Sequence, residues 1–190
     1  MAIRKTILFL LILLNVNFCE KIDKGDDPEY EKRLKETLSR YKSNIKDDYT
    51  ISETSNTKEE AIKKYLEAVQ RNEPDRFIFS KEEYFNIFLP NTLGMETLTS
   101  KMPEKEAWEL TDIRRRAALS RIQDIFKAYP GKSFTITKLT WRDDPKIMNA
   151  ITGYRVGTLE IKIGNHTHTI EEIRLIVGHK GKYKVCVIGT

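Results

Sequence analysis

Residues 152–188 read TGYRVGTLEIKIGNHTHTIEEIRLIVGHKGKYKVCVI and decide the fold class of this chain. The stretch is rich in β-branched and aromatic residues and contains two turn signals, which predicts three consecutive antiparallel strands. The first signal is Gly164-Asn165, which supplies the positive φ that a two-residue turn requires. This turn places Ile163 opposite His166, so one face of the hairpin is apolar with two histidines and the other is polar.

The second half of the stretch requires a bulge and a second turn. The apolar positions change parity after Ile170, which predicts one inserted residue at Glu171-Glu172 and a bent strand. For the second turn we expect the three-residue loop 179–181, because this loop keeps Val177 opposite Tyr183 and continues one apolar face. A two-residue Lys180-Gly181 turn would place the two apolar sets on opposite faces.

Helices are predicted before this sheet. A capping box at Thr57 opens a helix that stops at residues 72–75, and a second box at Ser80 opens a short helix that ends at Pro90. A long helix is expected over residues 103–128. Its apolar stripe has three-and-four spacing and contains Trp108, Arg115, Leu119, Ile122, Phe126 and Tyr129.

A strand over residues 133–141 and a turn over residues 142–146 complete the predicted elements. Helices followed by a curved antiparallel sheet predict an α+β domain, with the helices packed on the concave face. We expect this domain to span residues 57–190.

The N-terminus has the pattern of an export signal. Arg4 and Lys5 precede an apolar run that is too short to span a membrane, which predicts a signal peptide over residues 1–18. Cys19 follows, and the chain then becomes polar. This arrangement resembles the lipobox of bacterial, spirochaete-like lipoproteins, and the resemblance implies that Cys19 is acylated and anchors the protein. The alternative is an ordinary signal-peptidase cut beside Cys19.

Residues 19–56 are interpreted as a lipid-anchored tether. Within them a thin apolar stripe with helical spacing follows Asp27 and Pro28, which fit a helix cap and first turn. This helix either docks on the domain or stands as a spacer above the membrane. Residues 49–56 are rich in Ser, Thr and Asn and are expected to form a linker.

Two stretches resemble the nuclear-transport-factor-two-like, or cystatin-like, cone family. They are the helix EEAIKKYLEAVQRNEPDRF and the final strand GKYKVCVIG, and the resemblance covers roughly residues 57–190. It implies helices against a bent sheet. The family includes isomerases, cyclases, hydratases and non-catalytic modules, so the fold by itself does not choose a function.

Candidate ligand-binding residues lie on the first hairpin. His166 and His168 point to the same side of one strand, and Leu159 and Ile161 share that face. Two histidines at this spacing can bind zinc, but no further ligand is placed beside them by the sequence. We therefore assign no metal, no cofactor and no catalytic residue. An enzyme of the cone family would find an acid or base in one of His166, His168, Glu172 and Tyr154.

Two further features have a structural interpretation. The run Arg114-Arg115-Arg116 fans around a helix, so we expect it to pair with acidic neighbours or cover apolar surface. No nucleic-acid recognition motif accompanies the run. Cys186 is expected to be a small packing residue.

The chain carries 33 basic and 28 acidic residues, with a net charge of +5. Together these features predict an exported, lipid-anchored cell-envelope protein that faces the periplasm or the exterior. Its expected role is non-catalytic binding or structural support, with an envelope protein, an extracellular protein or an acidic polymer as partner. The alternatives are a small cavity enzyme of isomerase or cyclase type and a surface adhesin for acidic polymers.

Overall fold

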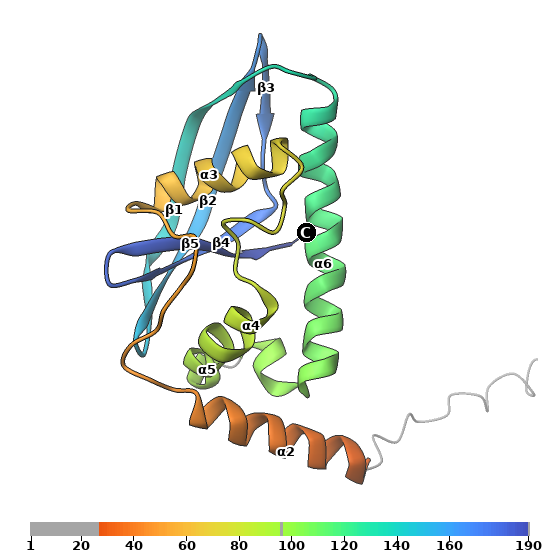
Figure 1. Ribbon diagram of the computed structural model, residues 1–190, viewed down its shortest axis with the longest axis vertical. Helices are drawn as coiled ribbons and strands as arrows, with labels where there is room; N and C mark the ends of the chain where they lie inside the picture. Colours follow the sequence, from red (N-terminus) through yellow and green to blue (C-terminus); the bar gives the residue numbers. More distant parts are fainter. Residues whose placement is uncertain (1–26, 96, 190) are drawn as a thin grey trace, which may run out of the picture. The chain divides into compact units, whose positions relative to one another are not determined.

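The computed structural model describes residues 27–95 and 97–189, so the predicted signal peptide and Cys19 lie outside the described residues. Helices come first in the chain and an antiparallel five-stranded sheet follows, which confirms the α+β class (Figure 1). The elements, in chain order, are α2 (Pro28–Ser43), α3 (Lys58–Gln70), α4 (Lys81–Glu83), the π-helical turn η1 (Tyr84–Phe88), α5 (Leu89–Asn91), the 3₁₀ turns η2 (Leu93–Met95) and η3 (Leu98–Lys101), α6 (Glu104–Lys127), β1 (Phe134–Met148), β2 (Ile151–Ile163), β3 (His166–Thr169), β4 (Ile173–His179) and β5 (Lys182–Ile188).

The long strand β2 organises the sheet. It pairs with β1 on one side and with both β3 and β4 on the other, and β5 lies outside β4. The predicted first hairpin is confirmed, because Ile163 pairs with His166 and Ile161 with His168. The register of β4 on β2 is offset by one residue from that of β3, which agrees with the insertion expected at Glu171-Glu172.

The second turn differs from the prediction. Lys180 and Gly181 have φ values of 47° and 74° and form a two-residue turn, so His179 pairs with Lys182 and Gly178 with Tyr183. The three-residue loop was expected because only one face of the sheet was assumed to be buried. In the structure both faces of β4 and β5 are covered, so apolar residues on either face are buried.

Two hydrophobic cores lie on the two faces of the sheet. On one face α3 and α6 pack over Ile176 and Val185, and Figure 1 shows α3 lying across the strands. On the other face α2, η1 and α5 cover the next residues along the same strands, Val177 and Cys186. Helices therefore cover both faces of the sheet, whereas the sequence predicted them on the concave face. Cys186 is 1% exposed, as expected for a packing residue.

Strand β1 continues where a turn was predicted. It runs to Met148, and the chain reverses at Asn149-Ala150, where Asn149 has a φ of 48°. The register between β1 and β2 shifts between Arg142 and Lys146, so the stretch that contains Pro145 bulges out of the pairing. The bulge absorbs the turn-forming residues without ending the strand.

The helix that starts at Ser80 continues through Pro90. Its capping box is confirmed, because the Ser80 side chain accepts the Glu83 N–H and the Glu83 side chain accepts the Ser80 N–H. Beyond it, the Leu89 N–H donates to the Tyr84 carbonyl, which is the wide spacing of a π turn. In an α-helix Pro90 would clash with the carbonyl four residues earlier, and the wider turn relieves this clash.

The part of the expected tether from Arg33 onward belongs to the compact unit Arg33–Thr190. Tyr41 of α2 is fully buried and lies 6.2 Å from the ring of Phe85, so this part of the helix docks. Farther along, Ser55 exchanges two backbone hydrogen bonds with Tyr183 of β5, at 2.8 and 2.9 Å. The expected linker thus pairs with the outer edge of β5 at Tyr183, and the segment 77–79 pairs with the same edge at Val185.

Candidate binding site

A cavity of about 310 Å³ lies between α3, the segment 74–81 and α6. We call it the Arg115 pocket. Its wall is mostly apolar and aromatic with a few charged groups, and its lining residues are Tyr65, Pro74, Asp75, Ile78, Phe79, Ser80, Lys81, Trp108, Asp112, Arg115, Arg116, Leu119 and Ile188. Clefts of this size and lining are typical of small-molecule sites.

One face of α6 supplies the floor of the pocket. Trp108, Asp112, Arg115 and Leu119 lie three or four residues apart, so their side chains project from the same side of the helix. The sequence showed Trp108, Arg115 and Leu119 as an apolar stripe that contained one arginine. The structure shows why an arginine belongs there, because the stripe faces a cavity at this point.

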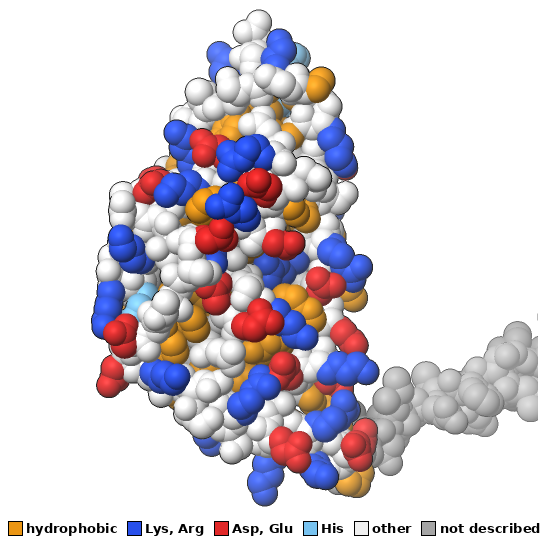
Figure 2. Space-filling view, in the orientation of Figure 1, with side chains coloured by type: hydrophobic (Ala, Val, Ile, Leu, Met, Phe, Trp, Pro, Cys, Tyr) orange, Lys and Arg blue, Asp and Glu red, His pale blue; other side chains and the backbone are white. Residues whose placement is uncertain are grey.

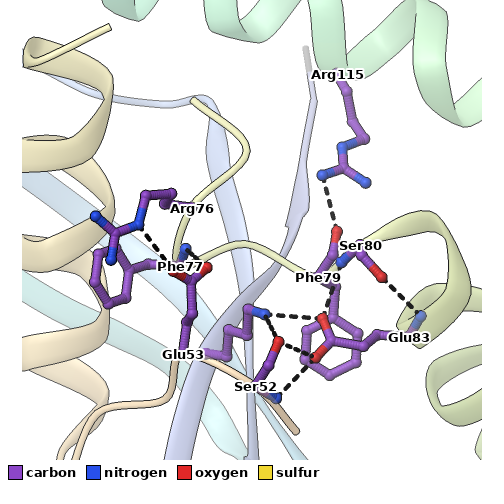
Figure 3. A network of polar contacts seen from close by, with 9 residues as sticks. Ser52, Glu53, Arg76, Phe77, Phe79, Ser80, Glu83 and Arg115 are labelled. Atoms are coloured by element: carbon purple, nitrogen blue, oxygen red, sulfur yellow. Dashed lines mark hydrogen bonds and ion pairs between the residues drawn. The ribbon is translucent and has the colours of Figure 1, made fainter. Parts of the chain in front are cut away.

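Arg115 is held in place by two contacts. Its Nη2 donates to the Phe79 carbonyl at 2.9 Å (Figure 3), and its guanidinium carbon lies 5.4 Å from the centre of the Trp108 ring. Its second terminal nitrogen, Nη1, is buried and has no hydrogen-bond partner among the described residues. The guanidinium is thus oriented by one nitrogen and leaves the other unsatisfied.

Tyr65 contributes a second unsatisfied donor. It projects from α3, its side chain is fully buried, and its hydroxyl has no hydrogen-bond partner within residues 27–95 and 97–189. Burial raises the pKa of Tyr65 well above its ordinary value of 10.0, although the nearby Arg115 acts in the opposite direction. The phenol therefore stays protonated at neutral pH and remains able to donate.

Charged groups of both signs surround these donors. Arg116 forms an ion pair with Asp112 at 2.9 Å, and the Lys81 ammonium lies 5.6 Å from the Trp108 ring. Asp75 also lines the cavity. The charge environment is mixed, so the pocket does not present a strong field of a single sign.

A second buried polar cluster lies on the other side of the segment 77–80. We call it the Lys184 cluster; it consists of Lys184, Glu83, Ser52 and Ser80, and Figure 3 labels the last three. The Lys184 ammonium is 2.8 Å from Glu83 Oε2 and 3.2 Å from Ser52 Oγ. The Glu83 carboxylate also accepts the Ser80 N–H and both the N–H and hydroxyl of Ser52.

Phe77 connects the two regions. Its φ is 58°, which is rare for a bulky residue, and its N–H faces Glu53 Oε2 at 3.5 Å. Arg76 donates to the same carboxylate at 2.8 Å. This ion pair stabilises the backbone just before Phe79, whose carbonyl orients Arg115.

The residues proposed from the sequence lie elsewhere. Leu159 and Ile161 are buried in the core beneath α6, so a ligand could reach them only by opening that core. The rings of His166 and His168 lie 5.4 and 5.3 Å from the ring of Tyr129. His168 Nε2 is buried without a hydrogen-bond partner.

The other candidates are separated as well. Glu172 is buried at the break between β3 and β4, and Tyr154 packs against Trp141 and Tyr183. Among the described residues, no three His, Cys, Asp or Glu side chains gather as they would around a metal ion. In the arginine run, Arg116 pairs with Asp112 and Arg115 covers Trp108, as expected.

Comparison with family models, curated proteins and solved structures finds no match for this chain. Within the part of the chain that the structure describes, no helix has both the length and the apolar character needed to cross a bilayer. The site must therefore be interpreted from its own chemistry.

Proposed function

We propose that this protein is an exported, lipid-anchored envelope protein whose domain is a non-catalytic binding module, with the Arg115 pocket as its binding site. The observation that carries the binding role is the pair of donors, Arg115 Nη1 and the Tyr65 hydroxyl. Both atoms are buried without hydrogen-bond partners among the described residues, and both belong to residues that line the cavity.

Unsatisfied buried donors are costly. Each one loses about 1–3 kcal/mol relative to its hydrogen-bonded state in water. Donors that remain unpaired next to a cavity are expected where a bound molecule supplies the acceptor. The two groups also suit binding better than proton transfer, because arginine stays protonated and burial raises the pKa of Tyr65.

The cone-like arrangement remains part of the proposal. The curved sheet with α3 lying against it is what the resemblance to the cone family implies, and a cavity at the side of such a sheet is a common place for a ligand. The cavity here lies between α3, the segment 74–81 and α6.

The cellular address rests on the N-terminal sequence. A charged start, a short apolar run and Cys19 support export and acylation. The test is intact mass and detergent partitioning of the native protein beside Cys19→Ala. We expect a diacylglycerol mass and detergent-phase recovery that the substitution abolishes. An unmodified, cleaved N-terminus in the aqueous phase would overturn the anchor.

The binding role is tested with a fragment library of acids, amides, amines and sugars, screened against the mature chain by ¹H–¹⁵N correlation spectra. We expect hits that shift the Trp108 indole signal, which Trp141→Phe distinguishes from the second tryptophan. Arg115→Met should abolish these shifts. The matched control Arg114→Met removes the same charge from an exposed position of α6 and should preserve them. A library without any hit at Trp108 would rule out the pocket as a binding site.

Both signs of charge are interleaved with hydrophobic side chains on the face drawn in Figure 2. A mixed surface of this kind favours recognition in a defined pocket over attraction by net charge. The proposal therefore places specificity in the Arg115 pocket.

A further inference from the structure

We infer that the Arg115 pocket binds a small organic monoanion, in which a carboxylate is attached to an apolar body. This inference rests on the proposed binding function and specifies its ligand class. It follows from the donors, the charge balance and the wall of the cavity.

The two unsatisfied groups require an acceptor. Arg115 Nη1 carries two N–H bonds and the Tyr65 hydroxyl one O–H; both lie just beneath the cavity surface, and a planar carboxylate can accept them once the covering side chains move aside. The Phe79 carbonyl holds Arg115 Nη2 at 2.9 Å, and the Trp108 ring lies against the guanidinium. The arginine is therefore oriented before a ligand arrives, which lowers the entropy cost of binding.

The charges around the cavity favour a single negative charge. Arg116 is paired with Asp112, so Arg115 and Lys81 are the lining cations without an ion-pair partner among the described residues. Asp75 and Asp112 line the same cavity. Lys81, Arg115 and Arg116 against Asp75 and Asp112 leave one net positive charge in the lining, which a monoanion neutralises and a dianion such as phosphate exceeds.

The wall accommodates an apolar body. Trp108, Phe79 and Ile78 form much of it, together with Pro74, Leu119 and Ile188. A volume of about 310 Å³ lies at the small end of ligand sites, which suits an aryl or alkyl acid. Burying such a body against aromatic side chains adds apolar contact to the charged hydrogen bonds.

The test is a calorimetric titration of the mature chain with three probes: 4-phenylbutyrate, its neutral amide and inorganic phosphate. We expect the carboxylate to bind at least about tenfold more tightly than the amide, because charged hydrogen bonds are stronger than neutral ones. Inorganic phosphate should give no heat above dilution. The Trp108 indole signal should move with the carboxylate.

Three variants locate the effect. Arg115→Met should weaken binding of the carboxylate more than about tenfold, and Tyr65→Phe about three- to tenfold. Arg114→Met should change it less than about twofold. Thermal unfolding of each variant shows that it is folded. Tyr65→Phe is the sharper probe, since it removes only a hydroxyl that makes no hydrogen bond within the described residues.

The outcomes separate this inference from the proposed function. If fragments shift Trp108 but the carboxylate binds no better than the amide, the pocket is a binding site and the monoanion is wrong. Tighter binding of phosphate would also overturn the monoanion. If neither the probes nor the library shifts Trp108, both proposals fail.

Discussion

The Lys184 cluster and the Arg115 pocket lie on opposite sides of the segment 77–80 and differ in one respect. In the Lys184 cluster, the ammonium has two partners and the Glu83 carboxylate accepts four hydrogen bonds. In the pocket, Arg115 Nη1 and the Tyr65 hydroxyl have none within the described residues. Both sites bury polar or charged groups, but only the Lys184 cluster provides hydrogen-bond partners for them from within the protein.

The difference separates stability from binding. A buried ion pair whose charges are matched within the protein joins remote segments and offers little attraction to a ligand. A buried donor without a partner costs stability in the free protein and can recover that cost when an acceptor binds. Three changes test this comparison, and they are ordered by expected size.

The largest effect is expected at Glu83. Glu83→Ala leaves the Lys184 ammonium, which is 2% exposed, without its charged partner, and should lower the free energy of unfolding by about 3–5 kcal/mol. The double variant Glu83→Leu with Lys184→Met should recover part of this loss, since it removes both charges but still leaves the Ser80 N–H and the Ser52 N–H and hydroxyl without their acceptor. Urea unfolding at pH 7 measures both values.

A surface pair is the control for this prediction. Glu67→Ala breaks the exposed contact between Lys63 and Glu67, at 3.9 Å, and should cost less than about 0.5 kcal/mol. If Glu83→Ala cost no more than Glu67→Ala, burial would not make the Lys184 cluster more important for stability than a surface pair. Labelling of the buried Cys186 thiol, which burial keeps protonated with a raised pKa, should accelerate in Glu83→Ala.

A moderate effect is expected on acidification. Burial acts to raise the pKa of Glu83, but the hydrogen bonds from Lys184 and the Ser80 N–H outweigh it, so the pKa is lowered. A carboxyl whose pKa is lowered in the folded state contributes its full stabilisation of the fold at pH values above its pKa in the unfolded chain. That contribution is lost as the pH falls through the pKa of the group in the folded protein. The urea concentration at the unfolding midpoint should therefore decline as the pH falls below the ordinary pKa range of carboxyl groups.

For Asp48, the pH range in which its stabilising contribution is lost is defined. Hydrogen bonds from Lys180 and then His179 lower its pKa from 3.8 to about 2, so its contribution should disappear between those values. Asp48→Asn should flatten the unfolding profile there. Arg115→Met should leave the shape of the profile unchanged, because the pocket donors do not titrate in this range. A profile that changed with Arg115 would contradict the comparison.

The smallest effect is expected at Tyr65. Tyr65→Phe removes a hydroxyl without a described partner and should change the free energy of unfolding by less than about 1 kcal/mol, toward greater stability. Tyr84→Phe is the matched control, since its hydroxyl lies 3.1 Å from Thr99 Oγ1, and it should cost about 1 kcal/mol. Chemical unfolding of both variants decides the order. Equal losses would mean that the Tyr65 hydroxyl has a partner.

The pocket shows what could be predicted from the pattern. Trp108, Arg115 and Leu119 share one helix face in the sequence, and an arginine within an apolar stripe was the available signal. Tyr65 lies in the stretch EEAIKKYLEAVQRNEPDRF, which was predicted only as a helix. Nothing in the spacing indicated that these two helices would leave a cavity between them, because that depends on the path of the segment 74–81.

For the histidine pair, the sequence predicted the positions of the side chains correctly. The sequence placed His166 and His168 on one side of a strand beside Leu159 and Ile161, and this arrangement is found. Its interpretation as a ligand face remains a prediction. The structure adds that Tyr129 lies against both rings and that the neighbouring aliphatic residues are packed in the core.

The sequence by itself determined the local elements: the Gly164-Asn165 turn with its register, the cap at Ser80 and the long helix α6. Each depends on residues a few positions apart, so short-range geometry specifies it. Only the tertiary structure decided that both faces of the sheet are buried, which in turn allows the Lys180-Gly181 turn. It also decided which polar groups are satisfied, because Lys184 meets Glu83 and Ser52 across 101 and 132 residues of chain.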